Sequence, residues 1–246
     1  MNGVPLTVPL LLELTETTSS LRETSYGETT RQLLLRLEKT LSRNLKWILK
    51  NYSSGLTSFS EALEASKKAV AKTDRQIIAV AANKLHIPVS SGSQMNAYVQ
   101  SYLGSQRSKR QGDFTQILTD TGTHSEPVTD GYWSSDPALD RRVDMLAHQN
   151  VWQDNNDILV YMTMLYYQQE RGVDIGVSTA AKPTTQPKEI TFVWQTHPEE
   201  SRAGPCEICD SLDDQEFSFD QINSLPFSAG DVHPSCYCTL EIRGMG

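Results

Sequence analysis

Cysteine is scarce and unevenly placed in this chain of 246 residues, which has four cysteines and none before residue 206. Scattered cysteines in a chain of this length are typical of buried, inert thiols. Here all four lie within the last 41 residues, in one pattern with a histidine. This clustering indicates a cross-link that holds a small C-terminal lobe together.

Long apolar runs are also missing: no window of 18 or more apolar residues exists, which excludes a transmembrane helix. The apolar segment at residues 4–12 is interrupted by two prolines and lacks a basic stretch and a small-residue cleavage site, so we expect no signal peptide. A chain without an export signal is made in a reducing cytoplasm, where metal binding is favoured over disulfides. Apolar and charged contents of 38% and 21% are typical of a soluble globular protein.

Motifs of known catalytic sites are absent as well. The chain has no Gly-rich phosphate loop and no nucleophile elbow. The segment that holds its C-terminal aspartates lacks the central glycine and the closing glutamate of a calcium-binding loop. We therefore interpret these aspartates as a solvated negative surface. We therefore predict that the protein is not an enzyme. The aspartates concerned are Asp210, Asp213, Asp214 and Asp220.

The cysteines form two tight motifs, Cys206-x2-Cys209 and His233-x2-Cys236-x-Cys238, joined by twenty-three residues. Thiolates and an imidazole at these spacings suit zinc, which takes four N or S ligands in a tetrahedron. We predict one zinc ion per chain. Five candidates compete for four places, so at least one is spare or only supports a ligand without binding the ion. Two alternatives stay open, a pair of disulfides between the two motifs and free thiols.

The charged residues that give the net charge of −8 are unevenly distributed along the sequence. Residues 186–246 hold eleven acidic and three basic side chains, whereas basic residues outnumber acidic ones by more than two to one over residues 22–110. A basic helical region can approach packaged DNA or an acidic protein ring. The alternative is that its lysines and arginines only solvate helix faces.

Leucine and isoleucine recur every three or four residues over 28–50, which predicts an amphipathic helix. A second helix is expected from Ser58 or Ser60 to about Leu85, and a third from Gln94 to about Gly104. The basic stretch at 105–112 is typical of an exposed loop, and residues 119–137 of a long loop or linker. Asp136 and Pro137 predict the start of a further helix that reaches Arg171 and is broken near Asn155 and Asn156.

The C-terminal region has a different character. Residues 190–194 are β-like, a second short strand is expected over 237–242, and the two prolines in 179–187 indicate a linker. We predict a mainly α fold with a small α+β C-terminal lobe. The expected domains are a helical arm (1–118), a linker and long helix (119–185), and the Cys/His cross-linked lobe (186–246).

Five further side chains can be interpreted from the sequence, four of them mainly in structural terms. Trp194 is expected to pack over the cysteine motifs as an anchor of a small core. His148 is interpreted as a partly buried, hydrogen-bonded histidine, and His197 as a minor ligand candidate outside the motif spacing. His86 and His124 are interpreted as loop residues.

The C-terminal pattern resembles the C-terminal domain of the phage Mu F-like minor head proteins, the tailed-virus head morphogenesis family. That family shows a Trp-bearing strand, a Cys-x2-Cys before a Leu-Asp-Gly-like turn, and a closing His-Pro-Asn-Cys-Arg-Cys. This chain has Phe192-Val193-Trp194, the turn Leu212-Asp213-Asp214, and the closing His233-Pro234-Ser235-Cys236-Tyr237-Cys238. Ser235 and Tyr237 replace the usual Asn and Arg, while every candidate ligand is retained. The match covers about residues 140–243, with a divergent form of the family's helix at 146–150.

The resemblance implies a structural virion protein, a portal-associated minor capsid protein that acts in head assembly. It would be made in the host cytoplasm and lie inside the head near the portal, in several copies and without a membrane. The implied partners are the portal protein and/or the major capsid protein, with packaged DNA as a further contact. An alternative function is a zinc-stabilised nucleic-acid-binding module, which the acidic charge of the lobe opposes because phosphate repels it.

Overall fold

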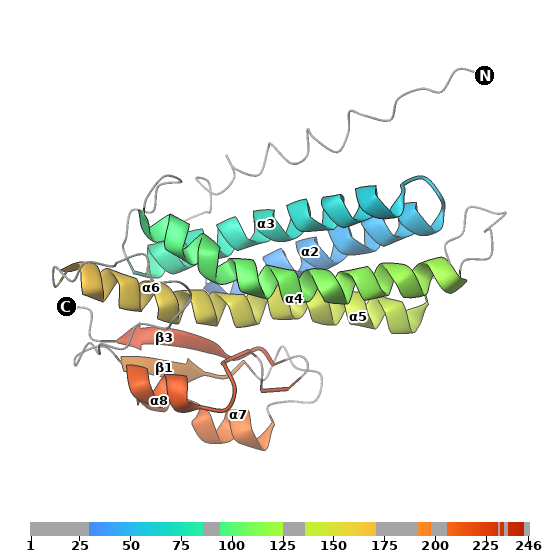
Figure 1. Cartoon of the computed structure of the whole chain (residues 1–246). Helices are drawn as coiled ribbons and strands as arrows, with labels where there is room; N and C mark the ends of the chain where they lie inside the picture. The colour runs from blue at the N-terminus through green and yellow to red at the C-terminus, as the bar shows by residue number, and fades with distance from the viewer. Residues whose placement is uncertain are drawn as a thin grey trace, which may run out of the picture.

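The computed structural model describes residues 30–85, 94–124, 136–170, 191–197, 206–230, 232–233 and 236–243. The described part is mainly helical with a small three-stranded antiparallel sheet, as predicted. Four long helical stretches run side by side, and the sheet packs against one of them (Figure 1). Within the described residues, no helix combines the length and apolarity needed to cross a bilayer.

The first two helices form an antiparallel hairpin. α2 (Thr30–Ser53) buries its leucine stripe, which confirms the predicted amphipathic helix. A turn containing Gly55, with a left-handed φ of 69°, leads to α3 (Phe59–Lys84). Ser58 caps α3 and exchanges hydrogen bonds with Glu61, as the sequence indicated. The buried residues of α2 are Leu34, Leu37, Leu41, Leu45, Ile48 and Leu49.

The third helix, α4 (Gln94–His124), is much longer than predicted. The expected loop at 105–112 is wrong: this stretch is helical, and so are residues 119–124 of the expected linker. The reason is tertiary, because two arginines of the stretch turn inward. Arg107 pairs with Asp74 of α3, and Arg110 pairs with Asp154 of α6. The predicted domain boundary at residue 118 therefore falls inside α4.

The last long helical stretch is interrupted. α5 (Pro137–His148) begins with Asp136 as its N-cap, as predicted, and passes through a π-helical segment (Gln149–Gln153) into α6 (Asp154–Glu170). The predicted break near Asn155 and Asn156 is thus a widened turn immediately before them. Such π segments often mark functional positions in helices.

The C-terminal lobe is built on the sheet order β2-β1-β3. The two predicted strands correspond to β1 (Thr191–Gln195) and β3 (Thr239–Arg243), which pair so that Trp194 lies opposite Leu240. A short third strand, β2 (Glu216–Ser218), was not predicted, nor were the two short helices α7 (Glu207–Leu212) and α8 (Phe219–Ser224). Figure 1 shows the sheet between the α5–α6 stretch and α7.

The lobe and the helical bundle share one hydrophobic core. Gly230 of the lobe has a φ of 83°, and a Cβ placed there would lie 2.9 Å from the backbone carbonyl carbon of Trp152. Only glycine allows this approach of the lobe to the π-helical segment. Nearby, the Nε1 of Trp152 donates to Glu38 of α2 at 2.7 Å. The predicted helical arm is therefore not detached from the lobe: its first helix supports the segment on which the lobe rests.

Candidate metal centre

The first cysteine motif is folded around the start of α7. Cys206 is the N-cap of this helix, and its Sγ accepts a hydrogen bond from the backbone N–H of Cys209 at 3.4 Å. This geometry places both sulfurs on one side of the helix start, with Cys209 buried and Cys206 partly exposed. Cys-x2-Cys is a spacing at which two thiolates commonly bind one zinc ion.

The second motif is folded as a turn that leads into β3. The backbone N–H of Cys236 donates to the carbonyl of His233 at 3.0 Å, which closes the turn. Cys236 and Cys238 are buried and His233 is partly exposed. The structure thus brings together all five predicted ligand residues, from two motifs that are far apart in the sequence.

Of two sulfur–sulfur distances from Cys209, the one to Cys236 matches that of a zinc-bound pair, and the one to Cys206 is shorter. The Sγ of Cys209 lies 3.3 Å from that of Cys206 and 3.8 Å from that of Cys236. Two sulfurs bound to tetrahedral zinc at about 2.3 Å lie about 3.8 Å apart. A disulfide requires about 2.05 Å, and all four cysteines are free thiols here.

The five ligand atoms form two overlapping groups. Cys206, Cys209 and His233 make one group, and Cys209, Cys236 and Cys238 make the other. Within each group the ligand atoms lie within 4.8 Å of one another. Cys209 belongs to both groups and so occupies the middle of the cluster. The described chain can therefore hold a metal ion at this position, with Cys209 as its central ligand.

The thiols influence one another's ionisation. A hydrogen bond from the Cys238 side chain lowers the pKa of Cys236 to about 5. Burial, followed by the hydrogen bond with Cys206, raises the pKa of Cys209 to about 12. The pKa of Cys238 is raised, first by its hydrogen bond to Cys236 and then by burial. Without a metal, the buried cluster therefore favours one thiolate, and the neighbouring thiols stay protonated. A bound divalent cation would stabilise several thiolates together.

Side chains of the bundle hold the backbone of the second motif. The Nε2 of His148 lies 2.8 Å from the carbonyl oxygen of Cys236, and the Nδ2 of Asn156 donates to the carbonyl of Cys238 at 3.0 Å. His148 is buried and its ring packs edge-on against Tyr237. The interpretation of His148 as a hydrogen-bonded core histidine is confirmed. Sequence reasoning did not identify Asn156 as a support of the site.

The remaining predicted residues lie outside the cluster. Trp194 is fully buried and packs edge-on against Phe217 and Phe227, which makes it an anchor of the lobe's core. The Nε2 of His197 lies 3.0 Å from the Thr239 hydroxyl, and His197 belongs to neither ligand group. Of the two histidines interpreted as loop residues, His86 lies outside the described residues, whereas His124 is the last residue of α4. The four aspartates Asp210, Asp213, Asp214 and Asp220 are exposed.

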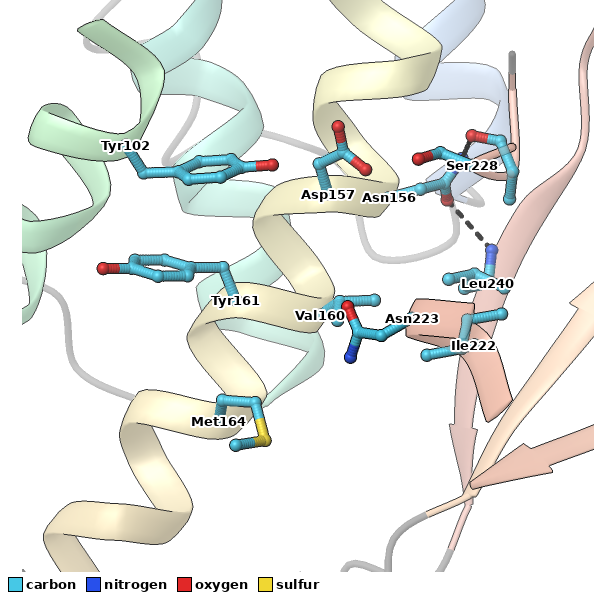
Figure 2. A pocket seen from close by; sticks show the side chains of 11 residues that line it. Tyr102, Asn156, Asp157, Val160, Tyr161, Met164, Ile222, Asn223, Ser228 and Leu240 are labelled. Atoms are coloured by element: carbon cyan, nitrogen blue, oxygen red, sulfur yellow. Dashed lines mark hydrogen bonds between the residues drawn. The ribbon is translucent and has the colours of Figure 1, made fainter. Parts of the chain in front are cut away.

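A small cleft lies between the bundle and the lobe. Figure 2 shows Tyr102 of α4 with its hydroxyl directed towards Asp157 of α6, and α8 and β3 close the opposite side. The rings of Tyr102 and Tyr161 stack with centroids 4.8 Å apart. Burial, with the charge of Asp157, raises the pKa of Tyr102. The cleft encloses about 40 Å³, enough for bound water but small for an organic substrate.

A larger cavity of about 220 Å³ lies among α2, α3, α4 and α5. Apolar side chains such as Val70 and Phe114 line most of it, and Arg107 and Arg110 border it. Both arginines already have carboxylate partners in the bundle. The cysteine cluster therefore remains the described site with the most specific chemistry.

The chain matches no protein-family model, and no similar curated protein or solved structure was found.

Proposed function

We propose that this chain is a structural virion protein, a portal-associated minor capsid protein of a tailed virus that acts in head morphogenesis. The observation that carries the proposal is the assembly of the family-like motifs into one unit. The strand with Trp194 pairs along its full length with the strand that follows Cys238. The Cys206-x2-Cys209 motif closes over the same unit from α7. This arrangement supports the proposal, because the motifs that carry the resemblance lie together in one lobe.

We further propose that the metal is zinc, with one ion per chain. Four sulfurs and an imidazole form a soft ligand set that suits zinc in a reducing compartment. The described part of the lobe has three short strands and two helices of six residues each, so the core that these elements enclose is small. A cross-link between α7 and the turn before β3 would stabilise it in the way that metals stabilise small domains. The role of the ion is structural, and no catalytic step is assigned to it.

The exposed cations of α2 support a role in assembly. The solvent side of this helix carries basic residues, and its opposite side is buried in the bundle. An acidic surface of the portal protein or the major capsid protein would fit this charge, and so would packaged DNA. The protein would then lie in the head interior near the portal, in several copies, after synthesis in the host cytoplasm.

A zinc-stabilised nucleic-acid-binding module is the second candidate, because an exposed tryptophan, Trp47, lies among the cations of α2. Cations combined with an exposed aromatic ring are features of single-strand binding surfaces. The acidic lobe opposes this function by repelling phosphate. The virion role therefore has more support.

The direct test is the protein composition of purified virus heads. We expect the chain in gradient-purified particles at several copies per head, cross-linked to portal or major capsid protein. Loss of its gene should lower the yield of infectious particles. The double variant Arg43→Glu/Lys50→Glu should be incorporated less well, while Arg141→Glu, an exposed control on α5, should be incorporated normally. Finding the chain free in infected cells and missing from mature particles would contradict the proposal.

A further inference from the structure

One side of α2 is a continuous basic surface with a tryptophan among the cations. At about 100° per residue, its six exposed residues, the neutral Gln32 and five others, fall within an arc of about 80° on the side opposite the buried leucines. No carboxylate lies in this arc: Glu38 turns to the other side, where it accepts from Trp152. We call the four cations and the tryptophan of this arc the basic face, which consists of Arg36, Lys39, Arg43, Trp47 and Lys50.

The position of the tryptophan in the basic face is unusual, because α2 otherwise buries its large apolar residues and exposes polar ones. Trp47 is 47% exposed, although the same helix buries six large aliphatic side chains. Tryptophan and arginine are enriched in the centres of protein interfaces, where aromatic rings bury much area. The composition of the basic face is therefore that of a contact surface for an acidic partner.

The lobe carries a surface of the opposite composition. α7 and the turn after it expose several carboxylates around Ile208, which is itself 47% exposed. The one Lys or Arg among the described lobe residues, Arg243, pairs with Glu216 at 2.8 Å and with none of these carboxylates in any described ion pair. We call this set the acidic face, and it consists of Glu207, Ile208, Asp210, Asp213 and Asp214.

The two faces are complementary in two respects. One has four cations and a large apolar side chain, and the other has four carboxylates and a large apolar side chain. They cannot meet within one chain, because the sheet and the α5–α6 stretch lie between α7 and the hairpin of α2 and α3 (Figure 1). A contact between them requires two molecules.

We propose that copies of this chain associate head to tail, with the basic face of one copy on the acidic face of the next. Because the two contacting surfaces differ, the contact is heterologous, and each copy keeps one face free for a further copy. Repeated contacts of this kind close into a ring or extend into a filament. The inference rests on the two faces alone and does not require the proposed virion function.

The contact should respond to salt in a defined way. Charges on exposed faces attract over about 10 Å at 0.1 M salt and over only about 3 Å at 1 M. We expect oligomers of the purified, zinc-loaded full chain at low salt and dissociation as sodium chloride is raised. Sedimentation velocity over a range of protein concentrations measures both states.

Two single substitutions separate the faces. Trp47→Glu disables the basic face only, and Ile208→Lys disables the acidic face only; each alone should weaken association at least about tenfold. Mixed in equal amounts, they should form a dimer and nothing larger, because the intact acidic face of the first meets the intact basic face of the second. Met145→Glu is the matched control, since Met145 is 40% exposed on α5 outside both faces and should not affect association.

Three results would overturn the inference. The wild-type chain could stay monomeric at low salt and high concentration. The mixture of the two variants could fail to form a dimer, as would happen if basic faces paired with each other. The basic face could instead bind single-stranded DNA while the protein stays monomeric, which would assign Trp47 to base stacking. If a variant loses zinc or unfolds, Arg43→Glu/Lys50→Glu replaces Trp47→Glu, and Asp210→Lys/Asp213→Lys replaces Ile208→Lys.

Discussion

The side-chain amide of Asn156 donates a hydrogen bond to the backbone carbonyl of Cys238 at 3.0 Å, which joins the helical bundle to the candidate metal centre. The Oδ1 of the same side chain accepts from the backbone N–H of Leu240, also at 3.0 Å (Figure 2). Asn156 thereby satisfies backbone groups at the entrance of β3 that would otherwise be buried without partners. One polar side chain in the core determines where the cysteine-bearing turn lies relative to α6.

Replacing Asn156 with alanine should therefore destabilise the protein by about 1–3 kcal/mol for each backbone group left unsatisfied. Urea unfolding with excess zinc measures the change in free energy. Asn44→Ala is the control, since Asn44 is a partly exposed asparagine on α2 and should change stability by less than about 0.5 kcal/mol. Equal effects of the two substitutions would show that Asn156 does not position the turn.

The buried pair of Arg110 and Asp154 supports a second prediction. Both side chains are buried, and Arg110 also donates to Asn150 at 3.0 Å. Above the pKa of Asp154, which is about 7, Arg110→Met leaves an unpaired carboxylate in the core and should cost about 3–5 kcal/mol. Arg110→Met/Asp154→Leu removes both charges and should recover most of that loss, whereas an equally unstable double variant would contradict this account.

The dependence of stability on pH provides a third prediction. Burial raises the pKa of Asp154 to about 7, although Arg110 acts in the opposite direction. The folded protein thus holds a proton that the unfolded chain releases near its ordinary value of 3.8. Asp154 therefore contributes stability that is fully present below that value and is lost as the pH rises towards about 7.

Asp154→Asn should weaken this dependence, so the difference in unfolding free energy between variant and wild type should grow in favour of the variant from pH 4 to pH 7. Burial also raises the pKa of Asp74. The unfolding free energy of the Asp154→Asn variant should therefore still fall as the pH rises, but less steeply than that of the wild type. Denaturation of both proteins with excess zinc at each pH isolates the contribution of Asp154. A difference that is constant over this range would contradict the prediction.

The fourth prediction concerns Cys209, which lies in both groups of candidate metal ligands. Because Cys209 belongs to both ligand groups, Cys209→Ser should impair metal binding at least as much as any other single substitution in the cluster. Loss of an outer hydrogen-bond partner of a metal ligand costs about 10–100-fold in affinity, and loss of a ligand should cost more. Comparing His233→Ala with Cys238→Ser by competition with a zinc chelator identifies the spare candidate, whose loss should have the smaller effect. A Cys209→Ser protein that binds zinc like the wild type would refute this arrangement.

The sequence predicted those features that depend on local signals. The leucine spacing predicted α2, and Ser58 and Asp136 marked the starts of α3 and α5, because periodicity and capping act within a few residues. The cysteine spacing likewise predicted the ligand cluster. α4 was predicted too short because Arg107 and Arg110 have partners 33 and 44 residues away, and composition alone suggested a loop.

Other features depend on contacts that have no local signature. β2 has three residues and α7 and α8 have six each, which is too short for a periodic pattern. Asn156 and His148 reach the second motif across 82 and 88 residues of sequence. A buried asparagine on a helix becomes recognisable as support for a metal site only when both segments are placed in space.

The metal content of the purified chain tests the central claim most directly. Elemental analysis of protein prepared under reducing conditions should find about one zinc per chain, and removal by a chelator should unfold the lobe and expose Trp194. Readdition of zinc should restore the buried tryptophan fluorescence, while magnesium should not, because it prefers oxygen ligands. Protein that carries no metal and shows two disulfides by mass spectrometry would contradict the account.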